Sequence, residues 1–190
     1  MRLIRVLAVG PLDRGLLEAL GDGVFRELGA GWEVSPSSLD PGFALDPIRQ
    51  QYHSTEILAR LHALPDEAAW RLLGVTGLDL FIPILTFVFG EAQLSNRCAL
   101  VSTARLRQEF YGLPPDPERL RERLLKETIH ELGHTLGLTH CSDYDCVMAA
   151  SHGVEWIDLK GSSFCPGCRE RVLEVNAGPT TAPAAPLLRG

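Results

Sequence analysis

Hydrophobic and polar residues follow two different periods along this chain, and these periods separate expected strands from expected helices. Residues 2–9 are rich in valine, leucine and isoleucine, as in a buried strand. Residues 12–28 have a helical period, and residues 32–34 predict a second, short strand. The chain is therefore expected to begin with a β-α-β unit.

The next segments combine turn-forming residues with one helix and one strand. Residues 35–48 are expected to form a loop because they are rich in proline, serine, aspartate and glycine. Ser54 is a candidate cap for a helix that ends near residue 64. Residues 71–75 are apolar and predict another strand.

Three further apolar segments precede the most informative part of the chain. Residues 81–85 are strand-like, but Pro83 argues against a central strand at this point. Residues 87–94 and 98–106 predict two more strands, which a short polar turn at residues 95–96 joins.

A long amphipathic helix is expected over residues 117–136. Charged residues separate apolar ones at helical spacing, namely Leu120, Leu124, Leu125, Ile129, Leu132 and Leu136. Beyond this helix the chain is dense in glycine, cysteine, serine and aspartate, and it becomes helical again over residues 166–176.

The length of the chain suits one domain, because 190 residues are enough to bury a hydrophobic core. We expect a single domain over residues 1–176, with an N-terminal α/β half over about 1–136 and a C-terminal half over about 137–176. The tail, residues 177–190, is rich in proline and alanine and is expected to be disordered. Folding requires no partner, so we expect a monomer.

Charge and cysteine content narrow the environment and the partners. The formal charge is -6 and no cluster of lysine and arginine stands out, which argues against nucleic acid or anionic lipid as a ligand. The first apolar segment is interrupted by Arg5 and followed by Pro11; it is too short for a membrane span and lacks the small-residue cleavage site of a signal peptide. We expect a cytoplasmic protein whose five cysteines lie in a reducing compartment.

The segment HELGHTLGLTH, residues 130–140, contains candidate metal ligands. His130 and His134 lie on one face of the expected helix, with Glu131 beside them. Gly137 tolerates the left-handed conformation that ends helices, so the chain can turn back and bring His140 to the same site. Three neutral imidazoles leave the fourth position of a zinc ion open, which is typical of catalytic zinc.

The other histidines carry no comparable pattern. His53 and His62 fall in a polar loop and helix region, and His152 falls in a loop. An ordinary surface or core position is the expectation for each of them, with a position facing the cleft as the alternative for His152.

Four cysteines cluster near the end of the chain, as two pairs separated by four and by two residues: Cys141, Cys146, Cys165 and Cys168. Four thiolates can close a tetrahedral shell around a structural zinc ion, and disulfides are the competing interpretation. Cys98, in an apolar segment, is expected to be a buried strand thiol.

The histidine motif resembles the HExxHxxGxxH signature of metzincin metallopeptidases, in which Met148 would serve as the Met-turn methionine. The longer pattern HELGHTLGLTHCSDYDCVM, followed by FCPGC, resembles the archaemetzincins. One departure is the spacing between Met148 and Cys165, about one residue shorter than in that family. An ordinary core role for Met148 is the alternative to a methionine packed beneath the zinc ligands.

This resemblance implies a metzincin-like α/β (α+β) fold with a mixed twisted sheet, an active-site helix and a small zinc-bound C-terminal subdomain. It implies two zinc ions, one catalytic ion on His130, His134 and His140, and one structural ion on the four cysteines. Glu131 would activate a zinc-bound water that hydrolyses a peptide or protein substrate. The segment FVFGEAQL, residues 87–94, is a candidate edge strand for that substrate, and an ordinary sheet edge is the alternative.

Two other functions remain open beside peptide hydrolysis. One is a zinc-binding regulatory protein with little turnover, and the other is a hydrolase of a small amide. Glu131 favours an enzyme, because metal binding alone requires no carboxylate at that position.

Overall fold

A five-stranded sheet forms the centre of the molecule, which a computed structural model describes over residues 2–177. Its order is β2-β1-β5-β8-β7, with the first four strands parallel and β7 antiparallel at one edge. The strands are β1 (Leu3–Val9), β2 (Gly31–Leu39), β5 (Arg71–Thr76), β7 (Gly90–Ala92) and β8 (Cys98–Ser102).

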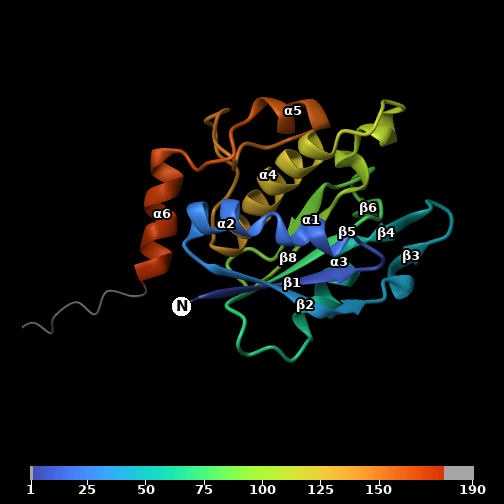
Figure 1. The fold of residues 1–190 in the computed structure, drawn as a ribbon, viewed down its shortest axis with the longest axis horizontal. Helices are drawn as coiled ribbons and strands as arrows, with labels where there is room; N and C mark the ends of the chain where they lie inside the picture. Colours follow the sequence, from blue (N-terminus) through green and yellow to red (C-terminus); the bar gives the residue numbers. More distant parts are fainter. Residues whose placement is uncertain (1, 178–190) are drawn as a thin grey trace, which may run out of the picture.

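Successive side chains of the central strands enter two different cores, one on each face of the sheet. In β1, Ile4 and Val6 belong to the larger core, while Leu7 and Val9 belong to the smaller one. The larger core also includes side chains of α1 (Arg14–Glu18), α2 (Gly21–Leu28) and α4 (Pro117–Thr135), and the smaller one includes side chains of α3 (Ser54–His62). Helices therefore cover both faces of the sheet (Figure 1).

Short elements connect these layers. A second, three-stranded sheet has the order β3-β4-β6 and contains β3 (Leu45–Asp46), β4 (Gln51–His53) and β6 (Leu80–Phe81). Three single 3₁₀ turns are η1 (Gly42–Ala44), η2 (Ala104–Leu106) and η3 (Gln108–Tyr111).

Two helices close the described chain, α5 (Val154–Leu159) and α6 (Pro166–Ala177). Helix α6 lies beside α2, where Arg169 forms an ion pair with Glu27 and donates a second hydrogen bond to the Glu27 carbonyl (Figure 1). The expected tail, residues 177–190, lies outside the described residues except for Ala177, which ends α6.

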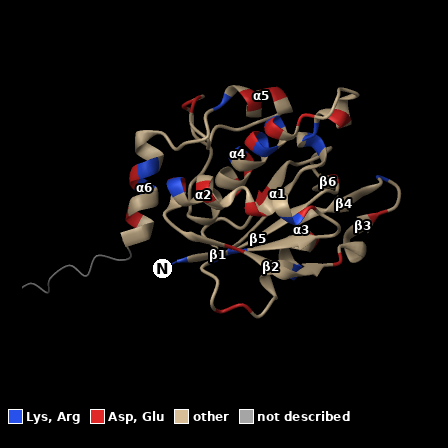
Figure 2. Cartoon of the chain, in the orientation of Figure 1, with Lys and Arg blue, Asp and Glu red and all other residues tan. Residues whose placement is uncertain are grey.

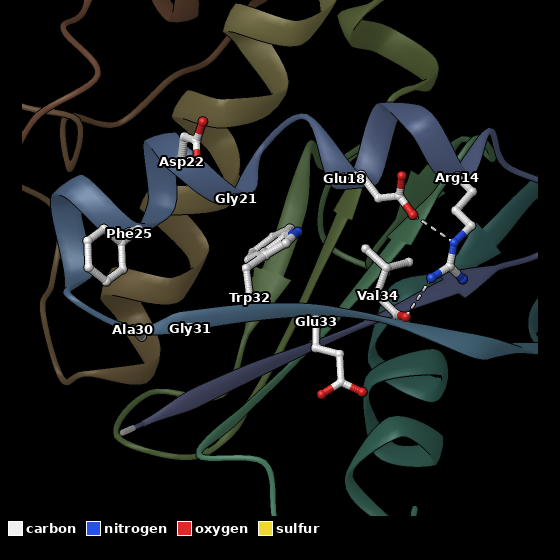
Figure 3. Close-up of a pocket in the computed structure, with 10 residues that line it drawn as sticks. All are labelled: Arg14, Glu18, Gly21, Asp22, Phe25, Ala30, Gly31, Trp32, Glu33 and Val34. Carbon is white, nitrogen blue, oxygen red and sulfur yellow. Dashed lines mark hydrogen bonds and ion pairs between the residues drawn. The ribbon is translucent and has the colours of Figure 1, made fainter.

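The edge strand β2 is longer than the sequence pattern predicts. Residues 35–39 of the expected loop continue the strand, and Pro36 lies within it. A proline is tolerated here because β2 is an edge strand and because the pairing with β1 shifts register between Val6 and Ala8. On its other side, Trp32 donates to the Leu17 carbonyl in a groove between β2 and the α1–α2 segment (Figure 3).

Other local expectations were partly wrong. The helical segment 12–28 is broken between Glu18 and Gly21 into two helices. Ser54 does not cap α3, because its hydroxyl donates to the Phe81 carbonyl and contacts the Glu91 carboxylate instead. The expected strands 81–85 and 87–94 shrink to β6 and β7, and the segment between them keeps a single isolated bridge, between Val88 and Leu80.

Charged side chains of both signs are interspersed over the helices, so neither sign dominates the view in Figure 2. Among residues 2–177, no helix combines the length and the apolar character that crossing a membrane requires.

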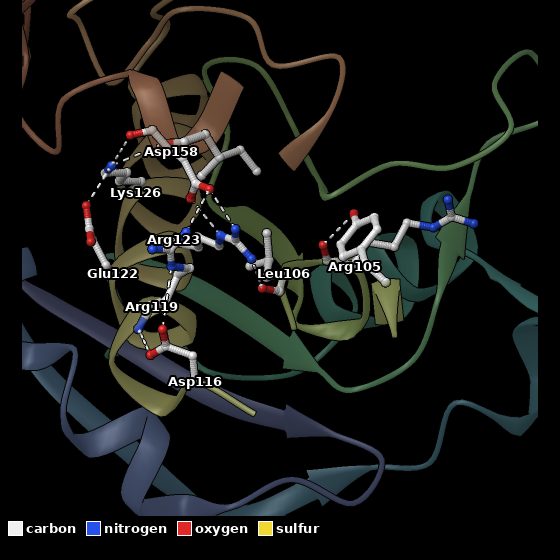
Figure 4. A network of polar contacts seen from close by, with 10 residues as sticks. Arg105, Leu106, Asp116, Arg119, Glu122, Arg123, Lys126 and Asp158 are labelled. Atoms are coloured by element: carbon white, nitrogen blue, oxygen red, sulfur yellow. Dashed lines mark hydrogen bonds and ion pairs between the residues drawn. The ribbon is translucent and has the colours of Figure 1, made fainter. Parts of the chain in front are cut away.

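A polar network ties α4 to α5 and η2 (Figure 4). The buried Arg123 guanidinium binds both carboxylate oxygens of Asp158, at 2.7 and 2.6 Å, and donates to the Leu106 carbonyl at 2.8 Å. Lys126 donates to the carbonyl oxygens of Ile157 and Asp158. These contacts fix the C-terminal segment against the helix that carries the histidine motif.

We expect Asp158→Asn to lower the free energy of unfolding at pH 7 by about 2 kcal/mol, because a two-pronged hydrogen bond to a buried cation is weakened. Hydrogen bonding to Arg123 lowers the pKa of Asp158 below its unfolded-state value of about 3.9. The stabilisation that ionised Asp158 gives the folded state is therefore complete above about pH 3.9, and it is lost as the pH falls through the folded-state pKa. Urea unfolding at several pH values should show the gap to wild type narrowing below about pH 4. Glu170→Gln, an exposed charge change, is the control, and an equal gap at all pH values would contradict the assignment.

Candidate active site

Helix α4 has a capped N-terminus, and it carries the first two histidines near its C-terminal end. The Asp116 side chain accepts the backbone N–H of Arg119 at 3.0 Å, and Pro117 occupies the first helical turn. The helix then continues to Thr135, which confirms the expected long helix and places His130 and His134 one turn apart.

The end of α4 turns the chain back toward the same site. Gly137 has φ +86°, its N–H donates to the His134 carbonyl, and the N–H of Leu138 donates to the Gly133 carbonyl. This pair of bonds is the Schellman arrangement, which needs a residue in the left-handed region. The predicted role of Gly137 is confirmed, and His140 follows it on the side of the other two histidines.

The three imidazoles converge on one point. Their ring centroids lie 4.7, 5.3 and 5.1 Å apart, and the Nε2 atoms of His130 and His134 are 3.1 Å apart. Nδ1 of His130 donates to the Val147 carbonyl at 2.8 Å, and Nδ1 of His134 donates to the Leu138 carbonyl at 2.7 Å. These two bonds leave each Nε2 as a lone-pair donor that faces the other.

This donor set fits a metal ion. Burial, together with the Lys160 ammonium, holds the pKa of His130 well below its usual value, and burial also lowers the pKa values of His134 and His140. The rings are therefore neutral near pH 7, as metal ligands must be. Two lone pairs 3.1 Å apart repel each other unless a cation lies between them, and tetrahedral zinc with bonds near 2.0 Å separates its ligands by about 3.3 Å.

Glu131 is buried beside this cluster and close to the edge strand. A Cβ atom built on Gly90 would lie 2.8 Å from Oε1 of Glu131 and 2.6 Å from the Leu100 carbonyl oxygen. Gly90 therefore leaves the space that the carboxylate occupies. Burial, with the neighbouring Glu127 carboxylate, raises the pKa of Glu131 well above its usual value.

A buried ion pair between Lys160 and Glu127 stabilises helix α4. Lys160 Nζ lies 2.9 Å from Oε1 of Glu127 and 3.5 Å from Nδ1 of His130, and it donates to the Ala149 carbonyl at 3.3 Å. Both charged side chains are less than 5% exposed. The pair joins the end of α5, the helix α4 and the chain that follows Met148.

Met148 packs directly under the histidine helix. It is fully buried, and a Cβ atom on Gly133, between the two helical histidines, would lie 2.5 Å from its sulfur. This placement beneath the ligands favours the Met-turn interpretation over an unrelated core position.

The four clustered cysteines also meet at one point. Their sulfur atoms all lie within 4.8 Å of one another, and the Sγ atoms of Cys141 and Cys165 are 3.8 Å apart. This separation is too long for a disulfide and matches the edge of about 3.8 Å in a tetrahedron of zinc–sulfur bonds near 2.3 Å. All five cysteines of the chain are free thiols, which argues against the disulfide alternative.

The electrostatics of the cluster also favour a bound cation. A backbone N–H of Cys168 lowers the pKa of Cys165, whereas burial and the neighbouring thiols raise the pKa of Cys168. Four thiolates so close together repel one another, and a divalent cation at their centre removes that cost. Cys98, in contrast, is a fully buried thiol in β8, as expected.

A cleft of about 370 Å³ opens over the histidine cluster. One wall is the segment 85–90 that leads into β7, and the other is α4 with Glu127, His130 and Glu131. His140 and His152 also line it, so His152 faces the cleft, the alternative left open by the sequence.

The remaining histidines lie elsewhere. His53 precedes α3 with its ring 5.2 Å from that of Phe81, and His62 has Nδ1 4.0 Å from the Cys98 sulfur. Gly90, Glu127 and Lys160 were missed by sequence reasoning. A glycine inside the apolar segment FVFGEAQL was the one available signal, because such a residue often marks a close approach.

Comparisons with known proteins agree with this geometry. A family model described as peptidase family M54 matches residues 43–174. The archaemetzincin of Methanocaldococcus jannaschii is 44% identical over 169 residues, covering 89% of this chain and 92% of the relative. The archaemetzincin of Thermococcus kodakarensis is 36% identical over 179 residues, covering 91% and 96%.

Solved structures show the same architecture. The crystal structure of archaemetzincin from Methanopyrus kandleri has a TM-score of 0.82 and 35% identity, covering 93% of this chain and 96% of that one. The one from Archaeoglobus fulgidus has a TM-score of 0.77 and 36% identity, covering 89% and 99%. The expected fold class, with its mixed sheet and active-site helix beside a C-terminal four-cysteine cluster, is confirmed.

Metal analysis of the purified protein should find about two zinc ions per chain. We expect His134→Ala to lose one ion and Cys168→Ser to lose the other, the latter with a melting temperature lower by about 5 °C or more, because a structural metal contributes folding energy. His62→Ala and Cys98→Ser change the same residue types outside both clusters and should keep both ions. Two ions in either cluster variant would contradict the two-site assignment.

Proposed function

Because the chain belongs to peptidase family M54, the archaemetzincins, and is therefore a zinc metallopeptidase, we propose that it hydrolyses peptide bonds at the cleft over the histidine cluster. His130, His134 and His140 would hold the catalytic zinc. The structural zinc would be held by Cys141, Cys146, Cys165 and Cys168. The observation that carries the proposal is the pair of imidazole Nε2 atoms, 3.1 Å apart, beside a buried carboxylate that faces the same cleft.

Glu131 is proposed as the general base. Zinc bound at the three histidines would supply Lewis acidity, polarising the scissile carbonyl and lowering the pKa of water toward about 7. Glu131 accepts a proton from the attacking water and then delivers it to the nitrogen of the leaving amine. Its position between α4 and Gly90 restricts the carboxylate to the floor of the cleft.

The edge of the sheet is the proposed site for the substrate backbone. Strand β7 pairs with β8 on one side only, and the segment 85–90 that leads into it, in which Val88 is bridged to Leu80, forms a wall of the cleft. An extended peptide can add to such an edge as another strand, which pairs its own N–H and C=O groups. This arrangement favours a polypeptide over a small amide, whose backbone would gain little from a strand edge.

We also propose that residues 1–176 act as one catalytic domain. The larger core supports this, because it includes Ile4 and Val75 of the N-terminal half together with Val147, Phe164 and Val172 of the C-terminal half. The cleft is then part of one folding unit.

The function is tested by exposing a mixed peptide library to the zinc-loaded protein and to Glu131→Gln with the same metal content, with the products identified by mass spectrometry. We expect cuts by the wild type and rates about 10²- to 10⁴-fold lower in the variant, because the amide cannot accept a proton. Cuts by neither protein would favour a zinc-binding regulatory role or a narrow small-amide substrate. Equal cutting by both would remove Glu131 from the reaction.

Gly90→Ala should reduce the rate of peptide cleavage by about 100-fold while both metal ions remain bound, because the new methyl group meets the Leu100 carbonyl oxygen and the Glu131 side chain, so that the edge strand and the carboxylate must both shift. Turnover and metal content measured on the same preparation check this. Gly77→Ala is the matched control, since its Cβ atom would meet nothing nearer than 3.7 Å. Unchanged turnover in Gly90→Ala would show that the carboxylate position is not limiting.

A further inference from the structure

Exposed apolar side chains surround a hollow that lies beside the catalytic cleft. The hollow has a volume of about 670 Å³, and we call it the apolar hollow; its apolar lining includes Phe43, Leu45, Pro47, Ile48, Phe81 and Pro83. Ile48 is 94% exposed, and Ile84, next to Pro83 in the chain, is 86% exposed. A cluster of large, exposed apolar residues on a protein surface usually marks an interaction site.

The turn that carries Ile48 is held in place by its own polar groups. Oδ1 of Asp46 accepts the N–H groups of Ile48 and Arg49, at 2.9 and 3.0 Å. Gln50 has φ +56°, a conformation that non-glycine residues rarely adopt. The turn between β3 and β4 is therefore held in one conformation, with the exposed Ile48 side chain at its tip.

The apolar hollow and the catalytic cleft share a wall. Pro83 lines the hollow, Leu85 lines the cleft, and Ile84 lies between them. Arg49 donates to the Leu85 carbonyl at 3.2 Å, and Gln51 donates to the Thr86 carbonyl at 3.0 Å. The hairpin formed by β3 and β4 therefore fixes the segment at Leu85 and Thr86, which forms one end of the cleft.

The polar groups around the apolar hollow are largely engaged with one another. The Arg49 guanidinium lies 4.3 Å from the centre of the Phe81 ring, and the Asp46 carboxylate is used by the turn. The His53 ring is the exception, because Nδ1 lies 3.5 Å from a carboxylate oxygen of Glu56 and neither ring nitrogen makes a hydrogen bond. A ligand in the hollow would therefore meet the apolar side chains together with the His53 imidazole and the Glu56 carboxylate.

We propose that the apolar hollow binds an apolar segment of the polypeptide substrate, several residues away from the scissile bond. This inference rests on the proposed peptidase function. Five residues separate Gly90, beside Glu131, from Leu85, so an extended peptide that lies along this segment covers up to about 16 Å, at about 3.3 Å per residue, before it reaches the hollow. The hollow therefore selects substrates with apolar residues about five or six positions from the cut.

Binding is measured by fluorescence anisotropy with zinc-loaded Glu131→Gln, so that no turnover is needed. The probes are three fluorescein-labelled peptides of about 16 residues with the same alanine-rich centre. One has a Leu-Val-Leu-Phe block about six residues before the centre, one has this block about six residues after it, and one has Ser-Thr-Ser-Gln in both places. We expect one of the two apolar peptides to bind at least about tenfold more tightly than the polar one.

Adding Ile48→Ser and Ile84→Ser should remove that preference, and adding Leu173→Ser, an exposed leucine of α6, should leave it intact. Equal affinities for all three peptides, or a preference that survives the double change, would overturn the inference even if the library shows cleavage. A preference that the double change removes would support it even without cleavage, in which case only the proposed function fails. Sedimentation that shows a wild-type dimer lost in the double variant would assign the hollow to a second copy of the chain and overturn the peptide assignment.

Discussion

Three neutral imidazoles direct one nitrogen each toward a common point, and the surrounding elements are arranged to hold them there. Carbonyl oxygens of Val147 and Leu138 bind the Nδ1–H groups of His130 and His134, and this fixes both tautomer and ring direction. The helix supplies the spacing of the first two rings, and Gly137 ends it where His140 can join them. Because the nitrogens repel one another when they face an empty centre, the fold itself creates the affinity for a cation.

The cysteine cluster and the turn at Met148 control the position of His140. Cys141 follows His140 directly, and its N–H donates to the Met148 carbonyl at 2.9 Å. Met148 in turn fills the space left by Gly133, so any shift of the turn would move α4 between its two histidines. A metal bound by the cysteines would therefore stabilise the catalytic geometry without taking part in the chemistry.

The sequence predicted those parts of the site that depend on residues close together in the chain. The length of α4, the end at Gly137 and the two ligand clusters all follow from spacing within about 40 residues. The extension of β2 through Pro36 and the reduction of the segment 87–94 to β7 depend on which strand lies at an edge, and composition does not encode this. The approach of Gly90 to Glu131 and the pairing of Lys160 with Glu127 join distant segments, which is why sequence reasoning missed them.

The pair of Lys160 and Glu127 is best understood through the charge balance of the site. A buried ammonium 3.5 Å from His130 would oppose a divalent cation held by the histidines, but the Glu127 carboxylate offsets its charge at 2.9 Å. With the histidines neutral, Glu131 is then the carboxylate among these groups that has no paired cation. Burial raises the pKa of Glu131, and a divalent cation held by the histidines would act in the opposite direction. The ion pair can therefore tether the Met148 turn through the Ala149 carbonyl while adding no net charge beside the histidines.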